Sequence, residues 1–191
     1  MTWLDLSLVL IAAALLGLER ACYFTVWRQP AWFRDAVSAW AGPAVNPVDA
    51  LADLFVGFKA LQAAVFLGWC IYFGDGRLLP IDRPIAGLTA GTILVVAGQC
   101  LNAAVFVKLG ATGVFYGNRF GHDVRWRYGF PFSWFRHPQY VGTVATIWGV
   151  FLALRWPHPD WIVLPLIETA YYIAGAWLED DATPPPTLNG A

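Results

Sequence analysis

Long apolar segments are the feature that most constrains the fold of this chain. Three of them, at about 4–27, 50–73 and 84–107, have the length of a membrane-spanning helix, roughly 17–25 mostly apolar residues. Two shorter apolar segments, at about 138–154 and 162–178, are joined by a tight turn rich in proline and tryptophan. The sequence therefore predicts an all-α integral membrane bundle of about five transmembrane helices, within a range of four to five. The last two helices are expected to form a helical hairpin.

The composition excludes a soluble globule. Hydrophobic residues make up 58% of the 191 residues, and charged residues only 13%, whereas soluble domains carry about 25% charged residues. A chain of this size cannot bury so much apolar surface within itself, so lipid is expected to cover the remainder. The net charge of −1 and the lack of a basic stripe argue against nucleic acid as a partner.

The chain is predicted to form one membrane domain over residues 1–181. The first apolar segment lacks a preceding Lys or Arg and carries Asp5, so we expect a retained helix and not a cleaved signal peptide. Residues 29–47 are expected to include a helix on the membrane surface. The tail at 182–191 is polar and proline-rich, a composition that predicts disorder. The spacing of the three cysteines and three histidines indicates no metal site.

Basic residues predict the orientation of the bundle. One side carries seven: Arg28, Arg34, Lys108, Arg119, Arg125, Arg127 and Arg136. The other side carries three: Arg77, Arg83 and Arg155. The positive-inside rule places the richer side in the cytoplasm. The start of the fourth predicted span and the end of the fifth then lie on the same, cytoplasmic, side, so one site could use both.

A polar motif, Arg-His-Pro-x-Tyr-x-Gly, opens the fourth predicted span. Pro138 is favoured at the first position of a helix, and the free N–H groups of a helix N-terminus attract anions. Arg136 would flank such an anion, and His137 would serve as a proton acceptor or hydrogen-bond donor. Tyr140 lies on the same helix face. The alternative is that Arg136 and His137 anchor the helix to lipid headgroups.

Glycines alternate with aromatic residues just after the third predicted span. Gly110, Gly113 and Gly117 are interleaved with Tyr116 and Phe120. Glycine permits a tight turn or a close approach of the backbone to a ligand, and the aromatic side chains would suit a flat heteroaromatic ligand. The alternative is a tight loop packed on the membrane surface.

Acidic residues mark the fifth predicted span. Glu179, Asp180 and Asp181 end it, where they oppose the helix dipole, so a cationic ligand or the basic loop is expected to compensate them. The alternative is a plain charged stop to the helix. Glu168 lies eleven residues earlier on nearly the same face, and an ionisable residue within a span is a functional candidate. Its partner would be Lys59 or Arg20, or it forms a structural hydrogen bond between helices.

The run LGATGVFYGNRFGHDVRWRYGFPFSWFRHPQYVGTVATIWGVFL, followed by LEDD after one more helix, resembles the phospholipid N-methyltransferases of the phosphatidylethanolamine type. The resemblance covers about 87–181, which would be the catalytic half. More distantly, the chain is similar to isoprenylcysteine carboxyl methyltransferases, which share the Arg-His-Pro-x-Tyr-x-Gly motif and a terminal acidic pair.

The resemblance implies a function and a location. It implies S-adenosylmethionine as methyl donor, bound without a metal on the cytoplasmic side. The acceptor would be phosphatidylethanolamine or its monomethyl or dimethyl form, in phosphatidylcholine synthesis. The expected location is the endoplasmic reticulum membrane in a eukaryote or the inner membrane in a bacterium. The alternatives are an isoprenylcysteine carboxyl O-methyltransferase and a non-catalytic lipid-binding protein of the same fold.

The resemblance also implies site residues. The family's Gly-x-Gly of helix three corresponds here to Val96 and Gly98, and its Glu-Glu pair to Glu179 and Asp180. The expected catalytic residues are His137, Tyr140 and Glu179, with His137 as the first candidate for the general base and His122 or Glu179 as alternatives. The expected cofactor-binding residues are Gly98, Tyr116, Gly117, Arg136, His137, Pro138, Tyr140, Glu179 and Asp180.

Overall fold

The structure, a computed structural model, describes residues 3–74, 76–79, 84–125 and 127–179. Its α-helices are α1 (Trp3–Arg28), α2 (Pro30–Ala41), α3 (Pro47–Phe73), α4 (Ile85–Val114), α5 (Pro138–Leu154) and α6 (Val163–Glu179). Two short 3₁₀ helices are η1 (Gly117–Phe120) and η2 (Pro159–Ile162). All elements within the described ranges are helical, so the predicted all-α class is confirmed.

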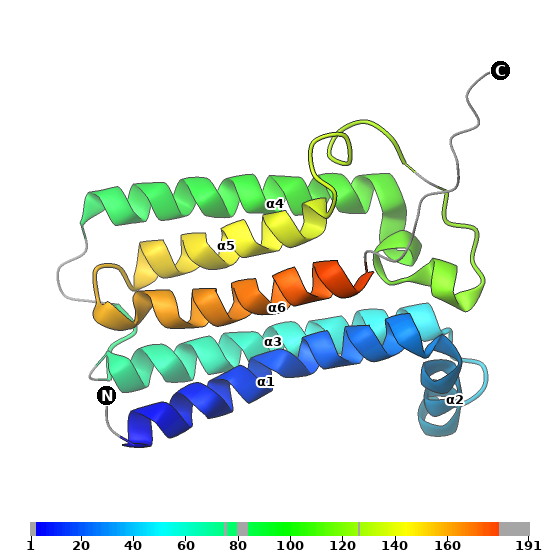
Figure 1. Cartoon of the computed structure of the whole chain (residues 1–191), viewed down its shortest axis with the longest axis horizontal. Coiled ribbons are helices and arrows are strands. Elements are labelled where there is room, and N and C mark those ends of the chain that lie inside the picture. The colour runs from blue at the N-terminus through cyan, green and yellow to red at the C-terminus, as the bar shows by residue number, and fades with distance from the viewer. Residues whose placement is uncertain (1–2, 75, 80–83, 126, 180–191) are drawn as a thin grey trace.

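Five long helices lie side by side and α2 lies across one end of them (Figure 1). The chain passes back and forth through the bundle, so the end that carries α2 also carries η1, the start of α5 and the end of α6. The last two helices form a hairpin through η2 at the opposite end. This order brings together the two segments that the sequence predicted to share a side.

In the part of the chain that the structure describes, four helical segments are long and apolar enough to cross a membrane: Leu4–Arg28, Pro47–Phe73, Ile85–Phe120 and Pro159–Glu179. Helix α5 is also apolar but has only 17 residues. Many large apolar side chains on these helices face outward, with exposed fractions as high as 84% at Val107, which suits contact with lipid. The prediction of an integral membrane bundle is therefore confirmed.

One helix boundary differs from the sequence prediction. The third span was expected to end near residue 107, but α4 continues to Val114. The helix changes direction at Gly110, whose φ of 67° and ψ of 173° are outside the helical region. Glycine adopts a positive φ at little cost, so the chain turns there without ending the helix. The extension carries Tyr116, just beyond the helix end, toward α5 and α6.

Helices α4 and α5 pack closely because glycines face each other across their contact. A Cβ atom built on Gly98 would lie 2.3 Å from the backbone oxygen of Gly142, and one on Gly91 would lie 2.5 Å from that of Gly149. Small residues let membrane helices approach at backbone distance. These pairs fix α5, and with it the start of the Arg-His-Pro motif, against α4.

A buried ion pair holds the hairpin turn against α3 at the other end of the bundle. The Arg155 guanidinium donates two hydrogen bonds to the Asp160 carboxylate, from Nη2 at 2.7 Å and from Nε at 3.2 Å. The indole N–H of Trp69 also donates to Asp160, at 2.7 Å, and His158 contacts the same carboxylate. Arg155 is completely buried.

Asp160→Ala is expected to destabilise the bundle strongly. Removing one partner of a buried ion pair leaves the other charge without compensation, which costs about 3–5 kcal/mol. The measurement is thermal unfolding in detergent, with Trp69→Phe as the control, because that change removes one neutral donor worth about 1 kcal/mol. A loss for Asp160→Ala no larger than that of Trp69→Phe would show that the ion pair does not hold the turn.

Candidate active site

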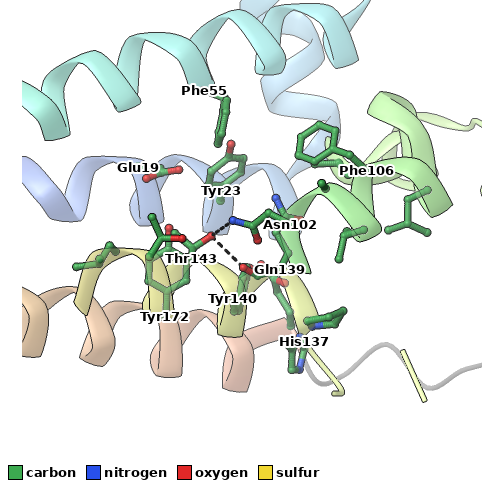
Figure 2. Close-up of a pocket in the computed structure, with 18 of the residues that line it drawn as sticks. Glu19, Tyr23, Phe55, Asn102, Phe106, His137, Gln139, Tyr140, Thr143 and Tyr172 are labelled. Atoms are coloured by element: carbon green, nitrogen blue, oxygen red, sulfur yellow. Dashed lines mark hydrogen bonds between the residues drawn. The ribbon is translucent and has the colours of Figure 1, made fainter. Parts of the chain in front are cut away.

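A cavity of about 670 Å³ opens within the bundle, near the end that carries the start of α5 (Figure 2). Residues from α1, α3, α4, α5 and α6 line it. Its volume falls in the range of roughly 300–1,000 Å³ that is usual for small-molecule sites. Polar and aromatic side chains converge on it within a bundle that is otherwise apolar, which makes it the candidate active site.

Three chain segments meet at the carboxylate of Glu179, the last residue of α6. The hydroxyl groups of Tyr116 and Tyr140 both donate to its Oε1 atom, each at 2.5 Å. Tyr140 comes from the first turn of α5, and Tyr116 follows α4 in a left-handed conformation, with φ of 55°. Two hydroxyl donors thus fix the orientation of this carboxyl group at the cavity wall, where a cation could bind.

Arg20 of α1 also lines the cavity, and its guanidinium is enclosed by three tyrosine rings. Its guanidinium carbon lies 4.3 Å from the ring centre of Tyr172, 5.0 Å from that of Tyr23 and 5.5 Å from that of Tyr140. A guanidinium over aromatic faces is attracted by their negative quadrupole. Since Tyr140 also donates to Glu179, Arg20 and the carboxylate are linked through one side chain.

A buried polar cluster continues the wall toward α3. Glu19, only 2% exposed, pairs with Arg20 at 3.0 Å and with the Lys59 ammonium at 3.1 Å. Gln62 donates to Glu19 at 2.6 Å and, through the same nitrogen, to Glu168 at 3.3 Å. Gln62 in turn accepts from Lys59 at 2.8 Å. The cluster therefore joins α1, α3 and α6 at one depth of the bundle.

The opposite wall comes from α4 and α5. The amide of Asn102 donates to the Thr143 hydroxyl at 3.4 Å, and that hydroxyl donates to the backbone oxygen of Gln139 at 2.9 Å (Figure 2). The side-chain amide of Gln99 donates to the Thr146 hydroxyl at 3.0 Å. These bonds place polar atoms along the α4–α5 seam of the cavity.

Six of the residues that the sequence singled out line this cavity: Tyr116, Arg136, His137, Pro138, Tyr140 and Glu179. The imidazole of His137 stacks on the Tyr140 ring, with ring centres 5.6 Å apart and an interplanar angle of 15°. Their neighbours Glu19, Arg20, Lys59 and Gln62 also belong to the lining, while Glu168 contacts it through Gln62.

Two of the predicted cofactor-binding residues do not line the cavity, and a third is not described. Gly98 lies in the α4–α5 contact and is not among the lining residues. Gly117 packs against Thr112, whose backbone oxygen would lie 2.6 Å from a Cβ at that position. Asp180 lies outside the described residues. The exposed His122, an alternative base, does not line the cavity either.

Gly98→Ala tests whether this glycine serves helix packing. The added methyl group would meet the backbone of α5 at 2.3 Å, so overpacking is expected to cost about 1–3 kcal/mol, measured by thermal unfolding. Gly57→Ala is the control, because a Cβ there meets no atom within 4 Å. Normal stability together with weakened binding of a methyl donor would instead give Gly98 a role in the site.

Sequence reasoning missed the two tyrosines that enclose Arg20 from α1 and α6. Tyr23 lies four residues after Glu19, and Tyr172 lies four residues after Glu168. That spacing puts each tyrosine on the same helix face as an ionisable residue within a predicted span, of which Glu168 was already singled out. The spacing along each helix therefore indicated these tyrosines, but it does not specify which helices face each other.

Within the residues that the structure describes, no group of three or more His, Cys, Asp or Glu side chains could hold a metal ion. The cavity instead offers carboxylates, cations and aromatic faces. Those groups suit an organic ligand that carries separate charges.

Comparisons with known proteins agree with this chemistry. Residues 86–184 match the family described as phospholipid methyltransferase. Over 71 residues the chain is 39% identical to a phosphatidyl-N-methylethanolamine N-methyltransferase of Arabidopsis thaliana, a match that covers 37% of this chain and 42% of that relative. The chain thus spans less than half of the length of this relative. No solved structure matches.

Proposed function

The chain belongs to the phospholipid methyltransferase family, and we propose that it transfers a methyl group from S-adenosylmethionine to the amine of a phosphatidylethanolamine-type lipid. The acceptor would be phosphatidylethanolamine or its monomethyl or dimethyl form. The observation that carries the proposal is the meeting of Tyr116, Tyr140 and Glu179 in one cavity, formed by the ends of α4 and α6 and the start of α5.

The residues present fit such a donor. S-adenosylmethionine carries a sulfonium, an amino group, a carboxylate and a flat adenine ring. The Glu179 carboxylate offers a partner for the cationic groups, and tyrosine faces stabilise positive charge. Arg136 and the first-turn N–H groups of α5, at the cavity edge, offer partners for the carboxylate. The part of the chain that supplies these groups is the part that matches the family.

The bound donor supplies an electrophilic methyl carbon. The lone pair of the lipid nitrogen forms the new N–CH₃ bond as the S–CH₃ bond breaks, and the electron pair of the broken bond stays on sulfur. A protonated amine must first lose a proton, because its lone pair is otherwise blocked. His137 is the proposed acceptor, since it lines the cavity beside Tyr140 and histidine changes charge near neutral pH.

Tyr140 is proposed to position both reactants. Its ring stacks on His137 and lies near the Arg20 guanidinium, while its hydroxyl donates to Glu179. One rigid side chain therefore links the proposed base to the proposed donor-binding carboxylate. Holding the reacting groups in line supplies much of the rate of a bimolecular transfer.

The proposal places the site at the cytoplasmic end of one domain. The elements at this end of the bundle, α2, η1 and the loop before α5, carry most of the basic residues on which the predicted orientation rests. The membrane would be the endoplasmic reticulum in a eukaryote or the inner membrane in a bacterium.

The test is an assay of the purified chain in nanodiscs with methyl-labelled S-adenosylmethionine. Phosphatidylethanolamine, its two partly methylated forms and a prenylcysteine analogue are offered separately. Label is expected in at least one of the three lipids. Label in the prenylcysteine alone would indicate a carboxyl O-methyltransferase, and failure to bind the donor by calorimetry would indicate a non-catalytic lipid-binding protein. Either result would overturn the proposal.

A further inference from the structure

One wall of the cavity comes from helices that lie outside the segment matching the family. Helices α1 and α3 supply Glu19, Arg20, Lys59 and Gln62 to the lining, whereas the match covers residues 86–184. Charged side chains within a membrane span are costly and mark a functional site by default. These charged residues are therefore expected to have a function separate from that of the proposed donor-binding groups near Glu179.

Two cations and one carboxylate of this wall line the cavity, and a second carboxylate, Glu168, contacts the wall through Gln62. Arg20 and Lys59 are cations, and they share the single carboxylate of Glu19. Arg20 is enclosed by three tyrosine rings, but the Lys59 side chain keeps 34% of its surface exposed. An ammonium group has three N–H donors, and Glu19 and Gln62 accept two from Lys59. Lys59 thus has the capacity to bind one more acceptor, preferably an anion.

Helices α3 and α4 both contribute to the cavity wall. These two helices make few direct contacts with each other, and both line the cavity, with Phe55 and Lys59 on one side and Gln99 and Phe106 on the other. Gln99 is an exposed polar residue in the middle of an apolar span. Its side-chain amide donates to Thr146 of α5, and it gives this part of the cavity wall a polar group that a lipid headgroup could contact.

Lys59 lines the same cavity as the residues of the proposed donor site. Helix α3 extends past the start of α5, so the middle of α3 lies at the level of the first turns of α5, with α6 drawn between the two helices (Figure 1). Lys59 and Tyr140 line the same cavity, and the chain of contacts from Lys59 to Glu19, Arg20 and Tyr140 joins them. A phosphate beside Lys59 would leave its ethanolamine arm free to point toward Tyr140.

We infer that Lys59 binds the phosphate diester of the acceptor phospholipid, which enters the cavity between α3 and α4. The inference rests on the proposed function and deepens it, since it assigns the residue that selects a phospholipid over other amines. The zwitterionic headgroup would place its phosphate at the Lys59 ammonium and its amine toward the Glu179 carboxylate. The N-terminal helices thus determine the acceptor, and the family-matched half holds the donor.

The test compares two acceptors in the full chain reconstituted in mixed micelles. One is phosphatidylethanolamine and the other is octadecylamine, a long-chain amine without phosphate. Lys59→Met is expected to lower kcat/KM for phosphatidylethanolamine roughly 10- to 100-fold, as expected for loss of a hydrogen-bonded charge, through a raised KM. The kcat/KM for octadecylamine and the Kd for S-adenosylmethionine are expected to stay within about threefold. Lys59→Arg is expected to restore most of the preference, because it keeps the charge.

The matched control is Lys108→Met, which changes an exposed lysine of α4 outside the cavity lining and is expected to leave both acceptors unaffected. An equal fall for both acceptors in Lys59→Met would show that Lys59 only supports the fold. A weaker Kd for S-adenosylmethionine with an unchanged lipid KM would assign Lys59 to the carboxylate of the donor. Either result overturns the inference while leaving the proposed function standing.

A second measurement does not depend on turnover. Native mass spectrometry of the detergent-purified chain with added phosphatidylethanolamine is expected to show less retained lipid for Lys59→Met than for the wild type or Lys108→Met. Equal retention would overturn the inference. A wild type that retains the lipid but labels none of the three phospholipids would instead contradict the proposed function alone.

Discussion

Replacing Glu179 by Ala is expected to abolish detectable binding of S-adenosylmethionine and, with it, methyl transfer. Truncating one partner of a buried, hydrogen-bonded charge pair costs about 2–5 kcal/mol, a loss of roughly 30-fold to several thousand-fold in affinity. The change also leaves the hydroxyl groups of Tyr116 and Tyr140 without their shared acceptor. Isothermal calorimetry in nanodiscs measures the loss directly.

Glu179→Gln separates the charge of this residue from its hydrogen bonds. Glutamine keeps the size of the side chain and one acceptor oxygen for the two tyrosines, but removes the negative charge. We expect Glu179→Gln to bind the donor nearly as poorly as Glu179→Ala while unfolding at the temperature of the wild type. Wild-type affinity in Glu179→Gln would show that the carboxylate does not hold a cation.

His137→Ala is expected to lower kcat roughly 100- to 10,000-fold, the usual contribution of a general base, while the Kd for S-adenosylmethionine stays measurable. Protons must leave the amine before attack, so the wild-type rate is expected to rise with pH as the base loses its proton. In His137→Ala, the part of this pH dependence that is due to the base is expected to disappear. Only the part that is due to titration of the lipid amine then remains. Stopped assays across pH, with both substrates saturating, measure the two profiles.

His122→Ala is the matched control for this experiment. His122 is exposed in the loop after η1 and does not line the cavity, so its replacement is expected to leave kcat and the pH profile unchanged. If His137→Ala keeps the wild-type profile, the base is another group. A change in His122→Ala alone would indicate that the loop closes over the site during turnover.

The membrane architecture could be predicted from the sequence because it depends on the length of apolar segments. A segment of about 20 apolar residues has few alternatives to a spanning helix, so α1, α3 and α4 were identified from their length. Pro138 also marked the start of α5. The end of α4 was placed too early, because a glycine that usually ends a helix here only turns it, at Gly110.

The candidate site was predictable only in part. The Arg-His-Pro motif and Glu179 lie at helix ends whose side of the membrane follows from counting spans, and the structure brings both to one cavity. Glu168 was predicted to pair with Lys59 or Arg20, or to form a structural hydrogen bond between helices. The structure shows the hydrogen bond, from Gln62 of α3, while Glu19 pairs with both cations. Such contacts depend on the order and rotation of helices around the bundle, which the spacing of residues along one helix does not specify.

The most direct test of the central claim is an experimental structure of the chain in a nanodisc with S-adenosylhomocysteine. We expect the sulfur of this ligand to lie inside the cavity, beside Tyr140 and within reach of the Glu179 carboxylate. Its adenine ring is expected to lie against the lining near Tyr116. Binding outside the cavity, or at the opposite end of the bundle near Arg155, would contradict the central claim.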